Sequence, residues 1–319
     1  MLSYNDVCVI IRSTGERTEQ VSYQILTKIF SNENVQIIRG MPFRETLKKG
    51  LEVGKASEKK WVLHIDADVL VHVDGIVRLL ERAGSLPDNI FEIQGLVIDK
   101  LIPIKRPAGN HLYKRKYIGN ALDHLRNIEN SLRPETRLLN KMRMNGYDWV
   151  QSDDIIGIHD YEQYYEDIMC KAFLHAKKHK SYLAIIEDYW QDKQNSDQDF
   201  YMAMWGSFIA KLNNDFKIYD RNLIKQEITP IVRFLEIEEK QEINDLSGIE
   251  AQINSLIKTY DSNSCTDFKK IYYIKKSDIN NSTNKWNKKI ESLIRRIFFK
   301  FGKELQNVGE KIKYIAQGY

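Results

Sequence analysis

Short apolar runs alternate with amphipathic stretches over the first hundred residues of the chain. Residues 7–11, 35–38 and 61–65 are apolar and rich in β-branched side chains, which is typical of strands buried on both faces of a parallel sheet. The intervening segments 22–30 and 44–56 place apolar residues at helical spacing. The order strand, helix, strand, helix, strand predicts an α/β fold with an open, mostly parallel central sheet and right-handed crossovers.

The pattern continues with a helix over residues 75–83 and a fourth strand over 91–98. Residues 100–149 lose this regularity and are rich in basic and aromatic side chains, apart from a short helical segment after Pro134. We predict that this segment is an insertion over the edge of the sheet, where such insertions often carry substrate contacts.

Helical periodicity returns in the second half of the chain. Residues 160–178 carry one apolar stripe, and Asp160 followed by Gln163 is a capping-box pattern that predicts the start of this helix. A further helix is predicted over 199–212, and the chain beyond residue 230 is charged and helical. These patterns predict an α/β domain of residues 1–225 and a helical C-terminal region of residues 226–319.

Composition places the chain among folded globular proteins, with 42% hydrophobic and 29% charged residues in 319. The formal net charge is only +4, and residues 280–319 hold nine Lys or Arg against three Glu, a net +6, which leaves about −2 for the rest. Because the basic character belongs to the C-terminal segment, we do not expect nucleic acid as a partner. No apolar run is long enough to predict a membrane-spanning helix.

The three cysteines, Cys8, Cys170 and Cys265, lack the spacing of a zinc site, which favours free thiols in a reducing compartment. The N-terminus passes into a strand pattern without the features of a signal peptide. Both observations predict a cytoplasmic location.

Two carboxylates, Asp66 and Asp68, follow the third predicted strand in the sequence WVLHIDADVLV. Chance alone gives roughly one Asp-x-Asp in a chain of this size, and Asp197 and Asp199 form a second one. The position of the first pair is more informative, because ligands of open α/β sheets bind beyond the carboxyl ends of the strands. Hard oxygen ligands suit Mg²⁺ or Mn²⁺, so a metal site and a solvated strand end remain as alternatives.

The apolar run VCVII with its polar turn, the segment LKKGLEVGKA and the sequence WVLHIDADV together resemble the nucleotide-sugar-binding half of a GT-A fold glycosyltransferase close to the family 2 type. The segments GNHLYKRKY, RPETRLLNKMRMNGYDW and IIGIHDYEQYYEDI resemble bacterial glycosyltransferases of polysaccharide and lipopolysaccharide gene clusters, and extend the similarity to about residue 178. The resemblance implies a metal-dependent transferase of the hexosyltransferase type. Such an enzyme moves a sugar from a nucleotide-diphosphate donor to a glycan or lipid-linked acceptor in surface polysaccharide synthesis.

The resemblance also implies roles for individual residues. Asp68 would bind Mn²⁺ or Mg²⁺, Asp66 would bind the metal or the ribose, and His159 would complete the metal site, although a buried turn histidine is the alternative. Many relatives carry an Asp after the second strand that reads uracil, and Arg39 stands there in this chain, so the base of the nucleotide is left open. The residues expected to hold the nucleotide sugar are Arg12, Ser13, Thr14, Gly15, Arg17, Arg39 and Asp66.

An inverting transferase needs a carboxylate near the acceptor hydroxyl, to take its proton as the sugar carbon is attacked. Asp153 and Asp154 are the favoured candidates, in a predicted loop before IIGIHD. Glu135 is a further candidate for the base, which the sequence does not rank against the others. Asp197 and Asp199 compete but are more simply read as helix caps, and Asp160 is likewise expected to be only an N-cap.

Residues 285–315 place Trp, Phe and aliphatic side chains on one helical stripe with Lys and Arg opposite. This pattern is typical of a helix on an anionic membrane surface, which predicts peripheral binding at the inner face of the cell membrane. A helix packed on its own domain or on a second copy, in a homo-oligomer, fits the pattern equally well.

Two functions other than an active transferase are alternatives for this sequence. One is a catalytically inactive transferase-like partner in a membrane assembly. The other is a haloacid-dehalogenase-like phosphatase, which wants Thr or Val two positions after the second Asp and usually has its Asp-x-Asp on the first strand. Here Leu70 occupies that position and the motif follows the third strand, so the phosphatase is disfavoured.

Overall fold

The computed structural model describes residues 3–40, 42–102, 104–128, 134–178, 183–212, 221–244 and 247–262. The chain divides into two compact units, Met1–Thr266 and Asp267–Tyr319, and every described residue belongs to the first. The predicted membrane helix of residues 285–315 and Cys265 lie outside the described residues. The predicted domain boundary after residue 225 stays a prediction.

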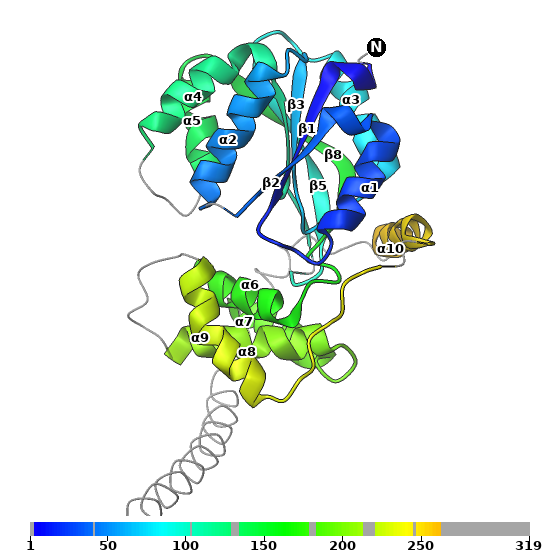
Figure 1. Cartoon of the computed structure of the whole chain (residues 1–319), viewed down its shortest axis with the longest axis vertical. Coiled ribbons are helices and arrows are strands. Elements are labelled where there is room, and N and C mark those ends of the chain that lie inside the picture. The colour runs from blue at the N-terminus through cyan, green and yellow to red at the C-terminus, as the bar shows by residue number, and fades with distance from the viewer. Residues whose placement is uncertain are drawn as a thin grey trace, which may run out of the picture. The chain divides into compact units, whose positions relative to one another are not determined.

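One eight-stranded sheet forms the centre of the first unit (Figure 1). Its strand order is β2-β1-β3-β7-β5-β8-β4, and β6 pairs with β5 outside this path. Strands β1, β2, β3, β5 and β8 run in one direction and β4, β6 and β7 in the other, which confirms the predicted α/β class with a mostly parallel central sheet. The strands are β1 Val7–Ser13, β2 Val35–Arg39, β3 Trp61–Asp66, β4 Val69–Val71, β5 Ile90–Asp99, β6 Lys105–Arg106, β7 Asn110–Lys114 and β8 Asp148–His159.

Helices connect the strands and continue beyond the sheet in the described part of the chain (Figure 1). Short 3₁₀ turns at Tyr4–Asp6, Asn32–Asn34 and Arg115–Tyr117 precede β1, β2 and the fourth helix. The helices are α1 Glu19–Ile29, α2 Phe43–Ala56, α3 Val73–Gly84, α4 Ile118–Arg126, α5 Pro134–Met144, α6 Tyr165–Lys178, α7 Leu183–Lys193, α8 Gln198–Leu212, α9 Arg221–Phe234 and α10 Ile249–Ser262.

The sheet buries both of its faces, as the uninterrupted apolar runs predict. Successive side chains of a strand point to opposite faces, so Val7 and Val9 pack in the cluster that contains apolar residues of α1, α3 and α10. Cys8 and Ile10 pack in the second cluster, with residues of α2, α4 and α5. Cys8 and Cys170 are both buried, and neither forms a disulfide, as predicted.

The prediction that residues 100–149 are an insertion over the sheet edge is wrong for β7. This strand lies inside the sheet, antiparallel to both β3 and β5. Leu112 and Tyr113 are fully buried there. The buried run of β7 is short and is followed directly by Lys114 and two further basic residues, which hid its apolar pattern in the sequence. The helix predicted after Pro134 is confirmed as α5.

The helix predicted over residues 160–178 is confirmed as α6, but its predicted N-cap is wrong. Asp160 has a φ of +62° and follows His159, the last residue of β8, instead of opening the helix. The first backbone amides of α6, at Tyr165 and Glu166, donate to the Glu239 carboxylate at 2.7 and 3.1 Å. A distant carboxylate therefore satisfies the orphan donors that a local cap would otherwise take.

Helices α6 and α8 approach closely where α8 carries Gly206. A Cβ added at Gly206 would lie 2.2 Å from the carbonyl oxygen of Met169 in α6, so the contact requires glycine. The α8 helix itself was predicted over residues 199–212 and is confirmed.

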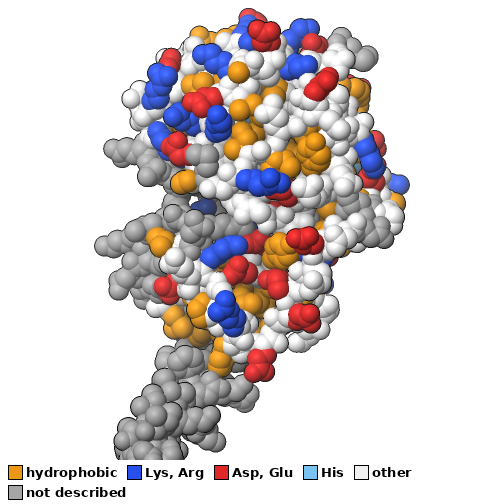
Figure 2. Space-filling model, viewed as in Figure 1, with side chains coloured by type: hydrophobic (Ala, Val, Ile, Leu, Met, Phe, Trp, Pro, Cys, Tyr) orange, Lys and Arg blue, Asp and Glu red, His pale blue; other side chains and the backbone are white. Residues whose placement is uncertain are grey.

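The surface carries both signs of charge. On the face that Figure 2 shows, Lys and Arg side chains are interspersed with Asp and Glu. None of the helices in the described ranges is long and apolar enough to cross a membrane.

Candidate metal and nucleotide site

The carboxyl ends of β3, β5 and β8 bring acidic residues together. β3 ends at Asp66, and Asp68 precedes β4. β4 pairs with β8 so that Val69 lies opposite His159, and β5 pairs with β8 so that Asp99 lies opposite the same His159. The backbone N–H of Asp160 donates to the carbonyl of Asp68 at 3.1 Å. Sheet pairing therefore places segments far apart in the sequence side by side.

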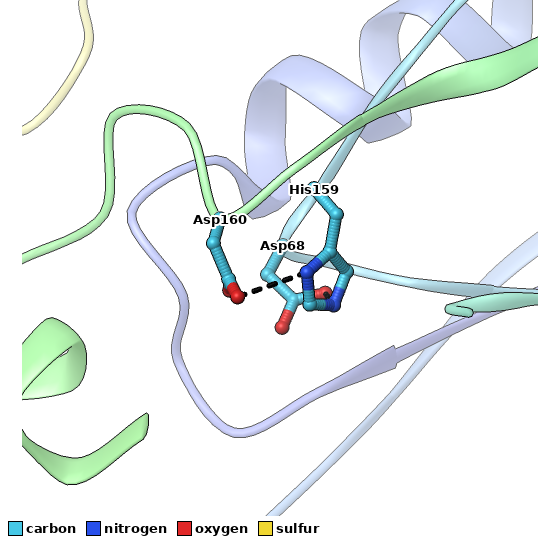
Figure 3. A group of neighbouring side chains, drawn as sticks. All are labelled: Asp68, His159 and Asp160. Atoms are coloured by element: carbon cyan, nitrogen blue, oxygen red, sulfur yellow. Dashed lines mark ion pairs between the residues drawn. The ribbon is translucent and has the colours of Figure 1, made fainter. Parts of the chain in front are cut away.

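Asp68, His159 and Asp160 form a buried group whose ligand atoms lie within 4.8 Å of one another (Figure 3). His159 Nδ1 lies 2.9 Å from Asp160 Oδ2, and His159 Nε2 lies 3.5 Å from Asp68 Oδ1. The structure thus places Asp68 and His159 side by side, and Asp160, expected only as a cap, belongs to the same group, while their roles as metal ligands stay predictions.

Three cations surround these carboxylates. Lys171 of α6 places its Nζ 2.6 Å from Asp68 Oδ2 and contacts Asp160 Oδ1. His159 Nδ1 also lies 3.0 Å from Asp99 Oδ2. Arg106 Nε donates to that same oxygen of Asp99 at 2.8 Å. The acids are therefore neutralised from three sides.

Burial and charge pull the pKa values of this group in opposite directions. Burial raises the pKa of Asp68, but Lys171 and His159 outweigh it, so the pKa lies below its ordinary value. Burial lowers the pKa of His159, but Asp160 and Asp68 outweigh it and raise it to about 10. His159 is thus an imidazolium at neutral pH, and a metal ion has to displace that proton because histidine ligands bind metals in the neutral form.

The group fits a hard divalent cation. Asp68 Oδ1 and Asp160 Oδ2 are buried and accept no hydrogen bond of good geometry from the described residues, although ring nitrogens of His159 lie 3.5 and 2.9 Å from them. A buried carboxylate oxygen without a donor is costly, and a metal ion would satisfy it. Two carboxylates and one imidazole are a donor set that suits Mn²⁺ or Mg²⁺.

Asp66 lies outside this group and contacts Arg12 instead. The two residues are register partners at the ends of β3 and β1, and Arg12 Nη2 lies 2.7 Å from Asp66 Oδ1. Burial raises the pKa of Asp66 to about 6, helped by the nearby Asp68 and opposed by Arg12. The two acids of the motif therefore have different partners.

Arg12 joins Asp66 to a second buried network, built around Glu135 in the first turn of α5. Glu135 Oε2 lies 3.2 Å from His111 Nε2, and His111 Nδ1 lies 2.7 Å from Glu92 Oε1. Burial lowers the pKa of His111, but Glu135 and Glu92 outweigh it and raise it to about 10. His111 and Glu92 had not been singled out from the sequence, where neither belongs to a recognisable motif.

The predicted nucleotide loop folds around Glu16. Ser13 Oγ donates to Glu16 Oε2 at 2.8 Å, and the backbone N–H of Thr14 donates to the same oxygen at 2.6 Å. Gly15 has a φ of +93°, which favours glycine at this turn. Arg17 pairs with Glu162 at 2.8 Å.

Arg39 lies beside this loop, since it is the register partner of Ser13. Its exposed side chain pairs with Glu19 at 2.5 Å. The structure places one of the residues predicted to hold the nucleotide, Arg12, in contact with another, Asp66. The roles of the others stay predictions.

Asp153 and Asp154 lie within β8, so the predicted loop is wrong. Asp154 is buried and pairs with Arg78 and Arg82 of α3 at 3.3 and 2.5 Å, while Asp153 is exposed. Along an extended strand, Asp154 is roughly 15 Å from His159. The polar run SDD has the pattern of a loop, because the sequence does not show that two arginines of α3 pair with Asp154. The role of Asp153 or Asp154 as catalytic base stays a prediction, and neither residue belongs to the candidate metal group.

The second Asp-x-Asp serves the start of α8. Asp197 Oδ1 accepts a hydrogen bond from the backbone N–H of Asp199 at 2.9 Å, which agrees with the predicted cap. Asp199 is buried between Lys100 and Lys240, at 2.5 and 2.6 Å. This motif is a structural ion cluster.

The central sheet and the helices on its two faces define an α/β fold with a mostly parallel central sheet, as the sequence predicts, while the GT-A type stays what the resemblance implies. No protein-family model matches the chain, and no curated protein matches it.

Solved structures that resemble this chain include two transferases and a synthase. A mannosyltransferase from Pyrobaculum calidifontis, in complex with GDP-Man and Mn²⁺, is 10% identical with a TM-score of 0.36, over 73% of this chain and 83% of that one. A glycosyltransferase involved in the glycosylation of the major capsid of PBCV-1 is 13% identical with a TM-score of 0.35, over 48% and 92%. The 4-diphosphocytidyl-2C-methyl-D-erythritol synthase from Anaerococcus prevotii is 8% identical with a TM-score of 0.36, over 50% and 88%. Similarity at this level carries no information about the chemistry of this chain, which rests on its own residues.

Proposed function

We propose that the chain is a metal-dependent glycosyltransferase that moves a sugar from a nucleotide-diphosphate donor to a glycan or lipid-linked acceptor. The observation that supports this most is the convergence of Asp68, His159 and Asp160 at the carboxyl ends of the strands. Open α/β sheets bind their ligands at this edge. The Arg12–Asp66 pair lies at the same edge, where the neighbouring strands β1 and β3 end.

Asp68, Asp160 and His159 would hold Mn²⁺ or Mg²⁺. A bound divalent ion supplies positive charge that stabilises the departing diphosphate. Asp66, fixed by Arg12, is assigned to the ribose of the nucleotide. The loop from Ser13 to Arg17 follows β1 and is assigned to the rest of the donor nucleotide.

For the catalytic base, contacts favour Glu135 over Asp153 and Asp154. Glu135 contacts Arg12, which in turn contacts Asp66 at the strand ends, whereas Asp154 lies farther back along β8 and pairs with arginines of α3. Burial raises the pKa of Glu135, but Arg12 and His111 outweigh it and hold the pKa below its ordinary value, so both cations would have to withdraw before this ionised carboxylate could take a proton from an acceptor hydroxyl.

The finer assignment is a hexosyltransferase of bacterial surface polysaccharide or lipopolysaccharide synthesis. It is supported by the resemblance of residues 110–178 to such enzymes and by the amphipathic pattern of residues 285–315, which suits a lipid-linked acceptor at a membrane surface.

Calorimetric titration of the purified protein with UDP, GDP, dTDP and CDP, with and without Mn²⁺, tests the proposal. We expect Mn²⁺-dependent binding of one nucleotide, lost in Asp68→Ala. Asp197→Ala is the matched control, because it removes the first acid of the other Asp-x-Asp, outside the candidate metal group, and should bind as the wild type does. If no nucleotide binds, or if Asp68→Ala binds normally, the transferase assignment fails, and an inactive assembly partner becomes the better explanation.

A further inference from the structure

Lys171 is held against the candidate metal group by the packing of its helix. Its neighbours in α6, Met169, Ala172 and Phe173, are fully buried. The lysine side chain is only 14% exposed, and its Nζ contacts one oxygen of Asp68 and one of Asp160. Lys171 is therefore a fixed internal cation at this site.

The remaining oxygens of the two carboxylates face His159. Lys171 contacts Asp68 Oδ2 and Asp160 Oδ1, while His159 lies near Asp68 Oδ1 and Asp160 Oδ2. The third acid, Asp99, is paired with Arg106 and His159. Each carboxylate that a metal ion would use thus already has a cation beside it.

A divalent ion bound by Asp68 and Asp160 would lie within a few ångströms of the Lys171 ammonium. Like charges at such a distance repel strongly in a buried site, where water does not screen them. The ammonium and the metal therefore compete for the same two carboxylates.

We propose that Lys171 is a resident cation that neutralises Asp68 and Asp160 in the metal-free protein and is displaced when a divalent ion binds. This inference rests on the proposed metal site. It means that Lys171 lowers the metal affinity of the site below the affinity that its ligands alone would give. In the metal-free state, Lys171 also keeps the two buried carboxylates from repelling each other.

Titration with Mn²⁺ alone, followed by calorimetry at one fixed pH, tests the competition. Lys171→Met keeps the apolar length of the side chain and removes its charge, so we expect Mn²⁺ to bind at least about tenfold more tightly than to the wild type. Lys171→Gln should shift the affinity in the same direction. An unchanged or weaker Mn²⁺ affinity in these variants overturns the proposal.

Lys225 provides a matched control. This lysine of α9 also bridges two acids, with its Nζ 3.2 Å from both Glu166 and Asp167, but it lies outside the candidate metal group. Lys225→Met should leave Mn²⁺ affinity within about twofold of the wild type, since sites without shared partners act independently. An equal gain in Lys225→Met would show a general charge effect and would also overturn the proposal.

A second measurement on the wild type does not depend on whether the variants fold. Acetic anhydride labels lysines according to their accessibility, and peptide mass spectrometry reports each site. Saturating Mg²⁺ should increase the labelling rate of Lys171, because its ammonium leaves the carboxylates, and should leave Lys225 unchanged. A Lys171 rate that Mg²⁺ does not raise contradicts displacement.

The failure of this inference can be told apart from failure of the proposed function. If Mn²⁺ binds to neither wild type nor Lys171→Met, yet a nucleotide binds without metal, the competition is refuted and a metal-independent nucleotide site remains. If Mn²⁺ binds as expected but no nucleotide does, the resident cation stands and the transferase does not.

Discussion

Replacing Arg12 with methionine should destabilise the protein far more than its size suggests. The Arg12 side chain is 2% exposed, pairs with Asp66 at 2.7 Å and contacts Glu135. Methionine has a similar apolar length, so Arg12→Met removes mainly the charge and its hydrogen bonds. Two buried carboxylates then lose the cation they share.

Breaking a buried ion pair by removing one partner costs about 3–5 kcal/mol, because the remaining charge is left uncompensated. The cost depends on pH in a defined direction. Without Arg12, the pKa of Asp66, already raised to about 6 in the folded protein, rises further, and the pKa of Glu135, which Arg12 and His111 hold below its ordinary value, rises as well. A carboxylate with a raised folded-state pKa costs nothing below its unfolded-state pKa, and its cost grows as pH rises toward the folded-state value. The deficit of Arg12→Met should therefore be largest at neutral pH and shrink by up to about 1.4 kcal/mol per pH unit and carboxylate on acidification.

Urea unfolding followed by far-UV circular dichroism at pH 5, 6 and 7 measures this deficit. Arg39→Met is the control, because Arg39 pairs with Glu19 at the end of the adjacent strand but is 57% exposed. Glu19 is itself only 9% exposed, but the pair opens to solvent on the Arg39 side, so this variant should lose about 1 kcal/mol, well below the deficit of Arg12→Met. A deficit for Arg12→Met below about 1 kcal/mol, or one that stays constant from pH 5 to 7, would refute the reasoning.

Three further results are expected. His111, with its pKa raised to about 10, contributes stability that is complete below about pH 6.5 and is lost as pH rises through about 10, so the wild-type free energy of unfolding should fall more steeply between pH 7 and 10 than that of His111→Gln. Gly206→Ala brings a Cβ within 2.2 Å of the Met169 carbonyl and should lower stability by about 1–3 kcal/mol, seen as a lower Tm, whereas an unchanged Tm would mean that α6 and α8 separate freely. In a sugar-transfer assay, Glu135→Gln should lower kcat by at least about 100-fold while Asp154→Asn stays close to wild type, and the reverse order would restore Asp154 as the base.

The fold was predictable wherever a buried element is an uninterrupted apolar run or has a clear helical period in the sequence. Strands β1, β2, β3 and β5 are apolar runs, and α1, α2, α3 and α8 have a clear helical period. β7 was missed because its buried face is short and polar groups such as His111 are satisfied by Glu92 and Glu135, which come from β5 and α5. A polar residue with distant partners looks like a loop residue in the sequence.

The candidate site was predictable in part for the same reason. Asp66 and Asp68 stand out by their place after a strand, and His159 was found through a resemblance. The local pattern predicts a helix cap at Asp160, because the sequence does not show that Glu239 accepts the hydrogen bonds of the α6 amides instead. Lys171 lies on a helical face that reads as ordinary solvent-exposed surface, and only the tertiary contact of α6 with the strand ends gives it a role.

The charges around the candidate metal group indicate what it is built to receive. Asp68, Asp99 and Asp160 carry three negative charges, and Lys171, Arg106 and protonated His159 carry three positive ones, so the buried group is close to neutral. A divalent ion that displaces the His159 proton would leave about one excess positive charge, since three acids face the ion, Arg106 and the nearby Lys171 ammonium in a site that water does not screen. A nucleoside diphosphate that arrives with the ion brings the missing negative charge. The group should therefore bind metal and diphosphate more tightly together than either alone, and this coupling must be reciprocal, with Mn²⁺ raising nucleotide affinity by the same factor as the nucleotide raises Mn²⁺ affinity.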